Sequence, residues 1–356
     1  MRFLLLTLIL VGCPRSGALN NHIDYESTPR LPSPSSGTYA QVPSTPTDHV
    51  VASVVGLRQW DASLSGAAAA IALSAVEGSG GLARWELREA LWRAGYPYPI
   101  AEARGWSVPQ KSPPPEALSV WLNASVEGDD IGLVRARASG GDAWVGIRAH
   151  PRVSVGTMPR YVDSGGTVVL PALPEVTYEV SDGKGKLLEG SLDTQQTFTL
   201  TIPGEWMFRL FDGQGTVAEF PLYCGIEPPT QALLEMPDMP VDTTKAAEER
   251  VRELLKKVRV DYGLAPFEDD TMLTSAVRSS IKEERDLGPL VEGLGFSLTK
   301  IWRCEGSTVE DCLDQLIWQP VNREVLLSTD YERFGVGGVL ASSQLQLVIV
   351  VAGDEE

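Results

Sequence analysis

The residues best suited to chemistry lie near the C-terminus, in the stretch Gln319–Gly338, QPVNREVLLSTDYERFGVGG. Asn322 and Arg323 open a short apolar run that predicts a helix, and a glycine-rich strand follows. Two neighbouring acids, Glu283 and Glu284, precede them in the chain. Amide and carboxylate oxygens can bind hard cations, and paired carboxylates can act as acid and base when burial separates their pKa values.

A solvated helix face is the simpler interpretation of Glu283 and Glu284, because Lys282 and Arg285 flank them. The three histidines of the chain all lie earlier, at His22, His49 and His150. A histidine-based zinc site is therefore excluded in the C-terminal part. The sequence also lacks a Walker loop, a dinucleotide fingerprint, a Gly-x-Ser-x-Gly elbow and a Cys-x-x-Cys pair. We predict no catalytic residue, no metal and no cofactor.

The cysteines suggest one covalent cross-link. Cys304 and Cys312 enclose a short loop, and a disulfide between them would contribute about 2–3 kcal/mol in the chain-entropy model. Cys224 would then stay single, on the core face of a strand that it shares with Phe220 and Leu222, where a thiol behaves as a small hydrophobe. A bridge from Cys224 to Cys304 is the alternative, and spacing does not choose between the pairings.

The N-terminus reads as an export signal that ends at a lipid attachment site. Residues 1–12 carry one positive charge, Arg2, and an apolar run shorter than the roughly 20 residues that span a bilayer. The Gly12-Cys13 pair at its end resembles a bacterial lipobox, in which the cysteine is lipidated. We expect Cys13 to anchor the chain in the cell envelope, at the outer membrane or the cell surface. A secreted chain is the alternative if Cys13 is not acylated.

Composition excludes one class of partner. The chain has 356 residues, with 30 Lys and Arg against 47 Asp and Glu, a formal net charge of -17. Phosphate backbones bind to basic faces, so we expect no nucleic-acid partner. A hydrophobic content of 43% supports packed cores, and the length allows two or three domains.

Changes in pattern divide the chain into segments. Residues 13–48 are rich in Pro, Ser and Thr without apolar periodicity, which predicts a disordered tether. Residues 49–150 show helical periodicity and end in two strand-like runs, whereas residues 151–226 alternate apolar and polar positions, as a small β-sandwich does. A Pro-rich linker, residues 227–244, leads to residues 245–352, which hold helices and a final strand pair.

Two of these segments resemble each other. Ile131–Ala149 aligns without a gap on Phe334–Ala352, and both contain an Ala-Ser turn followed by an apolar strand. Upstream, GLRQWDASLSGAAAAIA aligns with a small gap on GLAPFEDDTMLTSAVRSSI. We infer two related α/β domains, one on each side of the β-sandwich. Convergence of two short hairpins on similar composition is the alternative.

Residues 245–352 resemble the CAP superfamily, also called the SCP-like or PR-1-like family. Its motifs include Ser-Pro-x-His-Arg-x-x-Leu-Leu followed by a Gly-Val-Gly strand. The matching residues are Pro320, Arg323, Leu326, Leu327, Gly335, Val336 and Gly337. The resemblance implies an α-β-α sandwich with a cleft where two histidines and two acids can hold a divalent metal. Asn322 occupies the position where the family motif has histidine. The stretch therefore resembles the family in fold but argues against its metal site.

The resemblance implies an α+β fold class with a CAP-like C-terminal domain, a central immunoglobulin-like β-sandwich and a divergent CAP-like N-terminal domain. It assigns Asn322, Arg323, Glu283 and Glu284 to the cleft. We expect a non-catalytic envelope lipoprotein that binds or scaffolds a glycan, lipid or protein ligand. Hydrolysis of cell wall or peptide by the cleft carboxylates is the alternative.

An aromatic-rich stretch, Trp92–Trp106, is the candidate glycan-binding surface outside the cleft. It contains Tyr96 and Tyr98, which could stack on sugar rings. Core packing is the alternative, above all for Trp92.

Overall fold

The structure is a computed structural model that describes residues 38–39, 46, 48–77, 84–109, 112–138, 141–228, 241–341 and 344–354. Cys13, the expected signal peptide and nearly all of the expected tether lie outside these residues. The described residues form a mixed α/β protein with five sheets. None of their helices combines the length and apolarity needed to cross a membrane.

The C-terminal unit (residues 241–354) has a four-stranded sheet with the order β13-β15-β16-β14. Its elements are α5 (Thr244–Asp261), β13 (Glu268–Asp269), α6 (Thr271–Glu283), α7 (Leu287–Glu292), β14 (Leu298–Gly306), α8 (Val309–Ile317), α9 (Pro320–Leu327), β15 (Arg333–Ala341) and β16 (Gln344–Gly353). Asp270 caps α6 by accepting hydrogen bonds from the Met272 and Leu273 amides. Pro320 begins α9 at a position where its missing N–H costs nothing.

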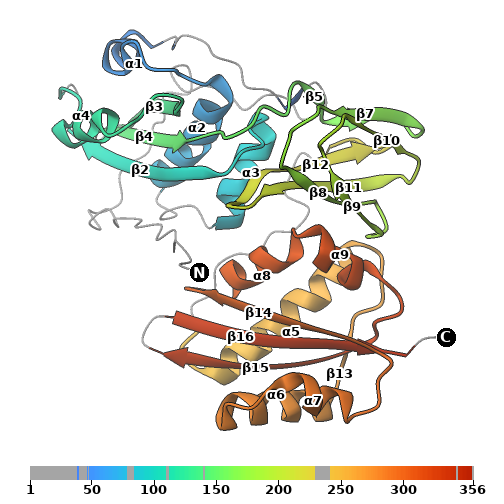
Figure 1. Ribbon diagram of the computed structural model, residues 1–356. Helices are drawn as coiled ribbons and strands as arrows, with labels where there is room; N and C mark the ends of the chain where they lie inside the picture. Colours follow the sequence, from blue (N-terminus) through green and yellow to red (C-terminus); the bar gives the residue numbers. More distant parts are fainter. Residues whose placement is uncertain are drawn as a thin grey trace.

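Helices cover both faces of this sheet (Figure 1). Alternate residues of β16 point to opposite faces, as strand geometry requires. Val348 and Val350 pack in a cluster with α6 and α7, whereas Leu347 and Ile349 belong to the cluster that contains α5, α8 and α9. The unit is thus a three-layer α-β-α arrangement, the layering that the CAP resemblance implies.

The N-terminal unit (residues 48–149) has a three-stranded sheet with the order β2-β4-β3. Its elements are α1 (His49–Val55), α2 (Ala62–Glu77), α3 (Arg84–Ala94), β2 (Ile100–Val108), α4 (Glu116–Asn123), β3 (Asp130–Ala138) and β4 (Gly141–Ala149). On β4, Trp144 packs with α1 and α4, whereas Val145 and Ile147 belong to the cluster that contains α2 and α3. This unit is also layered α-β-α.

The two units have the same strand order and the same hairpin register, as the predicted repeat requires. Ile131 pairs with Arg148 across the β3–β4 hairpin, and Phe334 pairs with Val351 across β15–β16, so the ungapped alignment preserves the register. The order β2-β4-β3 matches β14-β16-β15. One glycine in each unit lets a helix approach the sheet closely: Gly132 lies against α2 and Gly335 against α6.

A central β unit (residues 158–224) lies between the two α/β units in the chain. Its elements are β5 (Met158–Pro159), β6 (Tyr161–Val162), β7 (Gly166–Leu170), β8 (Thr177–Ser181), β9 (Leu187–Ser191), β10 (Gln196–Leu200), β11 (Gly204–Asp212) and β12 (Gly215–Cys224). Five strands pair in the order β6-β12-β11-β8-β9, and β10 pairs with β7. The two sheets meet where Phe198 packs edge-on against Phe208. The short strand β1 (Thr38–Tyr39) pairs with β5.

Candidate functional site

The helix α9 carries both motif residues, and both are buried. Asn322 is 6% exposed and Arg323 is fully buried. The Asn322 side-chain amide donates one hydrogen bond, to Gln319 Oε1 at 3.2 Å. It otherwise lines a narrow apolar space together with Leu255 and Trp302. Apolar side chains thus make up most of the surroundings of this amide among the described residues.

Arg323 is used to attach the C-terminal unit to the β unit. Its guanidinium Nη1 lies 3.1 Å from Glu205 Oε1 on β11 and donates to the Tyr262 hydroxyl at 3.2 Å. Tyr262, the residue that ends α5, donates its hydroxyl proton to the same Glu205 oxygen at 3.1 Å. Helix α9 packs against β8, β9 and β11, and Gly185 in the β8–β9 turn lies against Arg323 and Leu327. The side of α9 that carries Arg323 is therefore covered by the β unit.

A second contact joins α3 of the N-terminal unit to α8. Arg88 makes a two-pronged ion pair with Asp314. The Arg88 guanidinium also lies over the rings of Trp92 and Trp318, 4.9 and 4.8 Å from their centroids. The two indoles meet edge to face at 5.1 Å. Cation–π contacts of this kind are strongest where water is excluded.

Trp318 connects the two contacts. Arg88 lies near its ring from the N-terminal unit, and the Arg323 guanidinium lies 5.6 Å from its centroid. Both arginines thus converge on one indole at the meeting point of three units. We call this set the joint; it comprises Arg88, Trp92, Glu205, Tyr262, Asp314, Trp318 and Arg323.

The electrostatics of the joint follow from its burial. Burial raises the pKa of the Glu205 carboxyl, and the Arg323 guanidinium offsets part of that rise. Burial also raises the pKa of the Tyr262 phenol, so Tyr262 stays a neutral hydrogen-bond donor. The joint holds a charged pair out of water, which suits a structural contact more than a binding cleft.

The structure does not bring the four expected cleft positions together. Glu283 ends α6 and Glu284 caps it in a left-handed conformation with φ 50°, and this helix lies on the sheet face opposite α9. Both acids are exposed, and Glu283 pairs with Arg285 at 2.9 Å. The sheet therefore separates these acids from Asn322 and Arg323. Among the described residues, no cluster of His, Cys, Asp and Glu could hold a metal ion.

The aromatic stretch does not form a glycan surface, and core packing is the correct interpretation. Trp92, Tyr96 and Tyr98 are buried, with 4%, 0% and 3% exposure. Tyr96 donates to Asp130 Oδ2 at 3.0 Å, and Trp92 Nε1 donates to the Glu219 carbonyl of β12 at 2.8 Å. These contacts tie the N-terminal unit to its own strand and to the β unit.

The described histidines also lie away from Asn322. His49 is exposed at the start of α1, and His150 Nδ1 lies 3.0 Å from Asp129 Oδ1 at the end of β4. Both belong to the N-terminal part of the chain, and His22 lies outside the described residues.

The structure pairs Cys304 of β14 with Cys312 of α8 in a disulfide, so Cys224 does not bridge to Cys304. Cys224 is a buried free thiol whose Sγ donates to the Leu200 carbonyl at 3.2 Å. The bridge fixes α8, and with it Asp314 and Trp318, to the sheet of the C-terminal unit.

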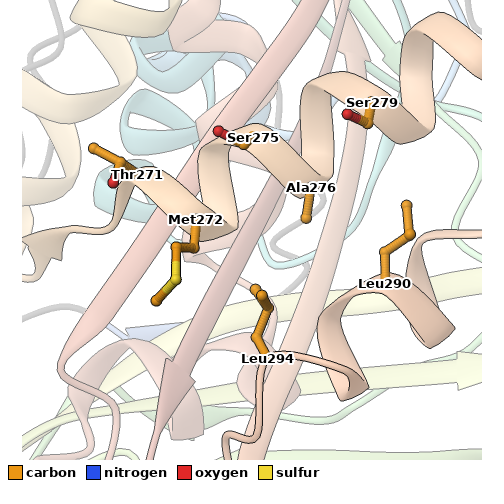
Figure 2. Close-up of a pocket in the computed structure, with 7 residues that line it drawn as sticks. All are labelled: Thr271, Met272, Ser275, Ala276, Ser279, Leu290 and Leu294. Carbon is orange, nitrogen blue, oxygen red and sulfur yellow. The ribbon is translucent and has the colours of Figure 1, made fainter.

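A separate hollow of about 400 Å³ lies between α6 and α7. Figure 2 shows Met272 and Ala276 on α6 opposite Leu290 and Leu294. Thr271, Ser275 and Ser279 add hydroxyls but no charge to its lining. This hollow offers apolar contact and lacks the groups that acid–base or metal chemistry needs.

The joint could not be read from the sequence. Glu205, Tyr262 and Arg88 come from three different units, and no local spacing connects them. The one local signal is Glu205, an acid at the start of a mostly apolar strand, GEWMFRLF.

No protein-family model matches the chain, and no curated protein sequence matches it. Solved structures with partial likeness include an outer surface protein from Borrelia burgdorferi, at 15% identity and TM-score 0.28, covering 33% of this chain and 99% of that protein. A cysteine-rich secretory protein from Staphylococcus aureus matches at 14% identity and TM-score 0.28, over 44% of this chain and 58% of that one. An extracellular SCP-domain protein from Bacillus anthracis matches at 13% identity and TM-score 0.26, over 65% and 87%. Scores this low carry no functional inference.

Proposed function

We propose that this protein is a cell-envelope lipoprotein whose CAP-like units act as a non-catalytic binding or scaffolding module. Residues 245–352 would form the CAP-like domain, residues 49–150 a divergent copy, and residues 151–226 an immunoglobulin-like sandwich between them. Cys13 would carry the lipid anchor, and the ligand would be a glycan, a lipid or a protein.

The joint is the observation that carries this proposal. Arg323, beside the position of the motif histidine, is fully buried against Glu205 and Tyr262. A side chain enclosed in this way cannot meet a substrate while the units are packed together. Arg323 therefore takes part in a contact between two units of the chain, a structural role that supports a non-catalytic module.

The acidic residues that a hydrolase would need here make structural contacts instead. Glu283 pairs with Arg285, and Asp286 caps α7 by accepting from the Gly288 amide at 3.2 Å. Glu305 accepts from the Gln346 side chain at 3.0 Å on the surface of the sheet. No described residue places a nucleophile or a second catalytic group between them, and a hydrolase needs such a group.

Incubation of the purified chain with cell-wall material tests the absence of catalysis. We expect sedimentation with the wall and no release of soluble fragments, and the E283Q/E284Q variant should behave identically. The exposed Glu292→Gln variant is the matched control for removing acidic charge from the same face. Fragment release that E283Q/E284Q abolishes and E292Q preserves would establish the hydrolase instead.

Membrane fractionation of a Cys13→Ser variant tests the lipid anchor separately. The wild-type protein should fractionate with membranes and the variant with soluble protein. Membrane retention of the variant would overturn the anchor while leaving the scaffolding role untouched.

A further inference from the structure

The C-terminal unit is attached to the rest of the protein through one face. Its main packing contacts with other units come from α8 against α3 and from α9 against β8, β9 and β11, and Tyr262 beside α5 adds a hydrogen bond to Glu205. Helices α6 and α7 lie on the opposite face of the sheet (Figure 1). A unit attached by one face can separate without breaking its own layers.

The joint combines charged pairs with buried aromatic rings. Two ion pairs, Arg88–Asp314 and Arg323–Glu205, cross it, and Trp92 packs edge to face on Trp318. Among the described residues, four buried N–H groups of the joint have no hydrogen-bond acceptor: Arg88 Nε, Trp318 Nε1, Arg323 Nε and Arg323 Nη2. Water can accept from these donors on separation, so the closed form is less strongly favoured than a fully satisfied interface would be.

The contacts that hold α8 and α9 inside the C-terminal unit do not cross the joint. The Cys304–Cys312 disulfide ties α8 to β14. Arg259 of α5 donates from Nη1 to the Leu326 and Ser328 carbonyls, at 3.0 and 2.7 Å, which ties α9 to α5. Both helices would therefore keep their positions after the joint has opened.

From these three observations we propose that the joint is an autoinhibitory contact. The C-terminal unit opens away from Glu205 and Arg88 as an intact body and uncovers the α8–α9 face with Trp318 and Arg323. The partner is a protein segment that presents a carboxylate to Arg323, because Glu205 occupies that place in the closed form. The inference goes beyond the scaffolding role and is independent of the lipid anchor.

Hydroxyl-radical footprinting of the full-length wild-type protein, followed by mass spectrometry, tests the opening directly, because it labels side chains when they become exposed. Trp318 and Trp302 are similarly buried, at 6% and 4% exposure, but only Trp318 lies in the joint. Opening of the intact unit predicts that Trp318 is labelled at least about tenfold faster than Trp302. Equal labelling rates for the two side chains would overturn the proposal.

Variants outside the C-terminal unit provide the second test. Arg88→Met and Glu205→Gln change the N-terminal and β units only, so an effect on α8 and α9 must pass through the joint. We expect both to accelerate labelling of Trp318 at least about tenfold while Trp302 keeps its wild-type rate. Arg104→Met is the control, because Arg104 lies on β2 of the N-terminal unit and pairs with Glu102 outside the joint. Equal acceleration by Arg104→Met, or equal acceleration at Trp302, would overturn the proposal.

Discussion

Arg323 Nη1 and Glu205 Oε1 lie 3.1 Å apart across the boundary between α9 and β11, with side chains 1% and 3% exposed. An ion pair this deeply enclosed stabilises a fold only while both partners remain, because removal of one leaves an uncompensated charge. The pair therefore makes the arrangement of two units depend on one motif residue.

Substitution of Arg323 by Met should lower the free energy of unfolding by about 3–5 kcal/mol, because Glu205 would stay buried without its partner. The double variant R323M/E205Q should recover much of that loss, since the uncompensated charge is then absent. Urea unfolding of the four proteins in a double-mutant cycle measures the coupling. A coupling near zero would show that Arg323 acts through packing alone.

The stability of Arg323→Met should also depend on pH. Burial already raises the pKa of Glu205, and loss of Arg323 removes the opposing effect, so the rise becomes larger. A raised pKa means that the folded state binds the proton more tightly than the unfolded state. The variant should therefore gain stability as the pH falls from about 8 to about 5 and lose it as the pH rises. Thermal unfolding across this range, with R323M/E205Q as the flat control, provides the measurement.

Substitution of Gly132 or Gly335, the equivalent glycines of the two α/β units, should lower stability by similar amounts. A Cβ on Gly132 would lie 2.5 Å from the Leu64 carbonyl carbon, and one on Gly335 would lie 2.5 Å from the Leu273 carbonyl carbon. Gly132→Ala and Gly335→Ala should each cost about 1–3 kcal/mol, since α2 or α6 must move off the sheet. Gly213→Ala, where no atom lies within 4 Å of the added carbon, is the matched control. Thermal unfolding of the three variants gives the comparison, and similar losses for all three would argue against the shared packing.

Reduction of the Cys304–Cys312 bridge should destabilise the C-terminal unit by about 2–3 kcal/mol, the loop-closure contribution for a separation of 8 residues. The double variant C304A/C312A should be less stable than the oxidised wild type and indifferent to reductant. Thermal unfolding with and without dithiothreitol measures both. An unchanged melting temperature of the wild type under reducing conditions would contradict the bridge.

The repeat could be predicted from the sequence because the register of a hairpin depends on residues that lie close together in the chain. The alignment of Ile131–Ala149 on Phe334–Ala352 required only that matching residues pair in the same way, and they do. The Cys304–Cys312 pairing was likewise one of two that spacing allowed. Aromatic content misled for Tyr96 and Tyr98, because composition does not show whether a ring is exposed, and both rings are buried.

The sequence by itself determined that residues 245–352 carry a CAP-like pattern, that no histidine stands at position 322, and that the chain is strongly acidic. Only the tertiary structure showed which side of each α/β unit packs against another unit. In α9, Pro320, Arg323 and Leu327 are buried. The residues that follow the same helical spacing in α4, Glu116, Ser119 and Asn123, are exposed. The β unit covers α9, whereas solvent faces that side of α4, and such contacts between distant segments leave no local periodicity to read.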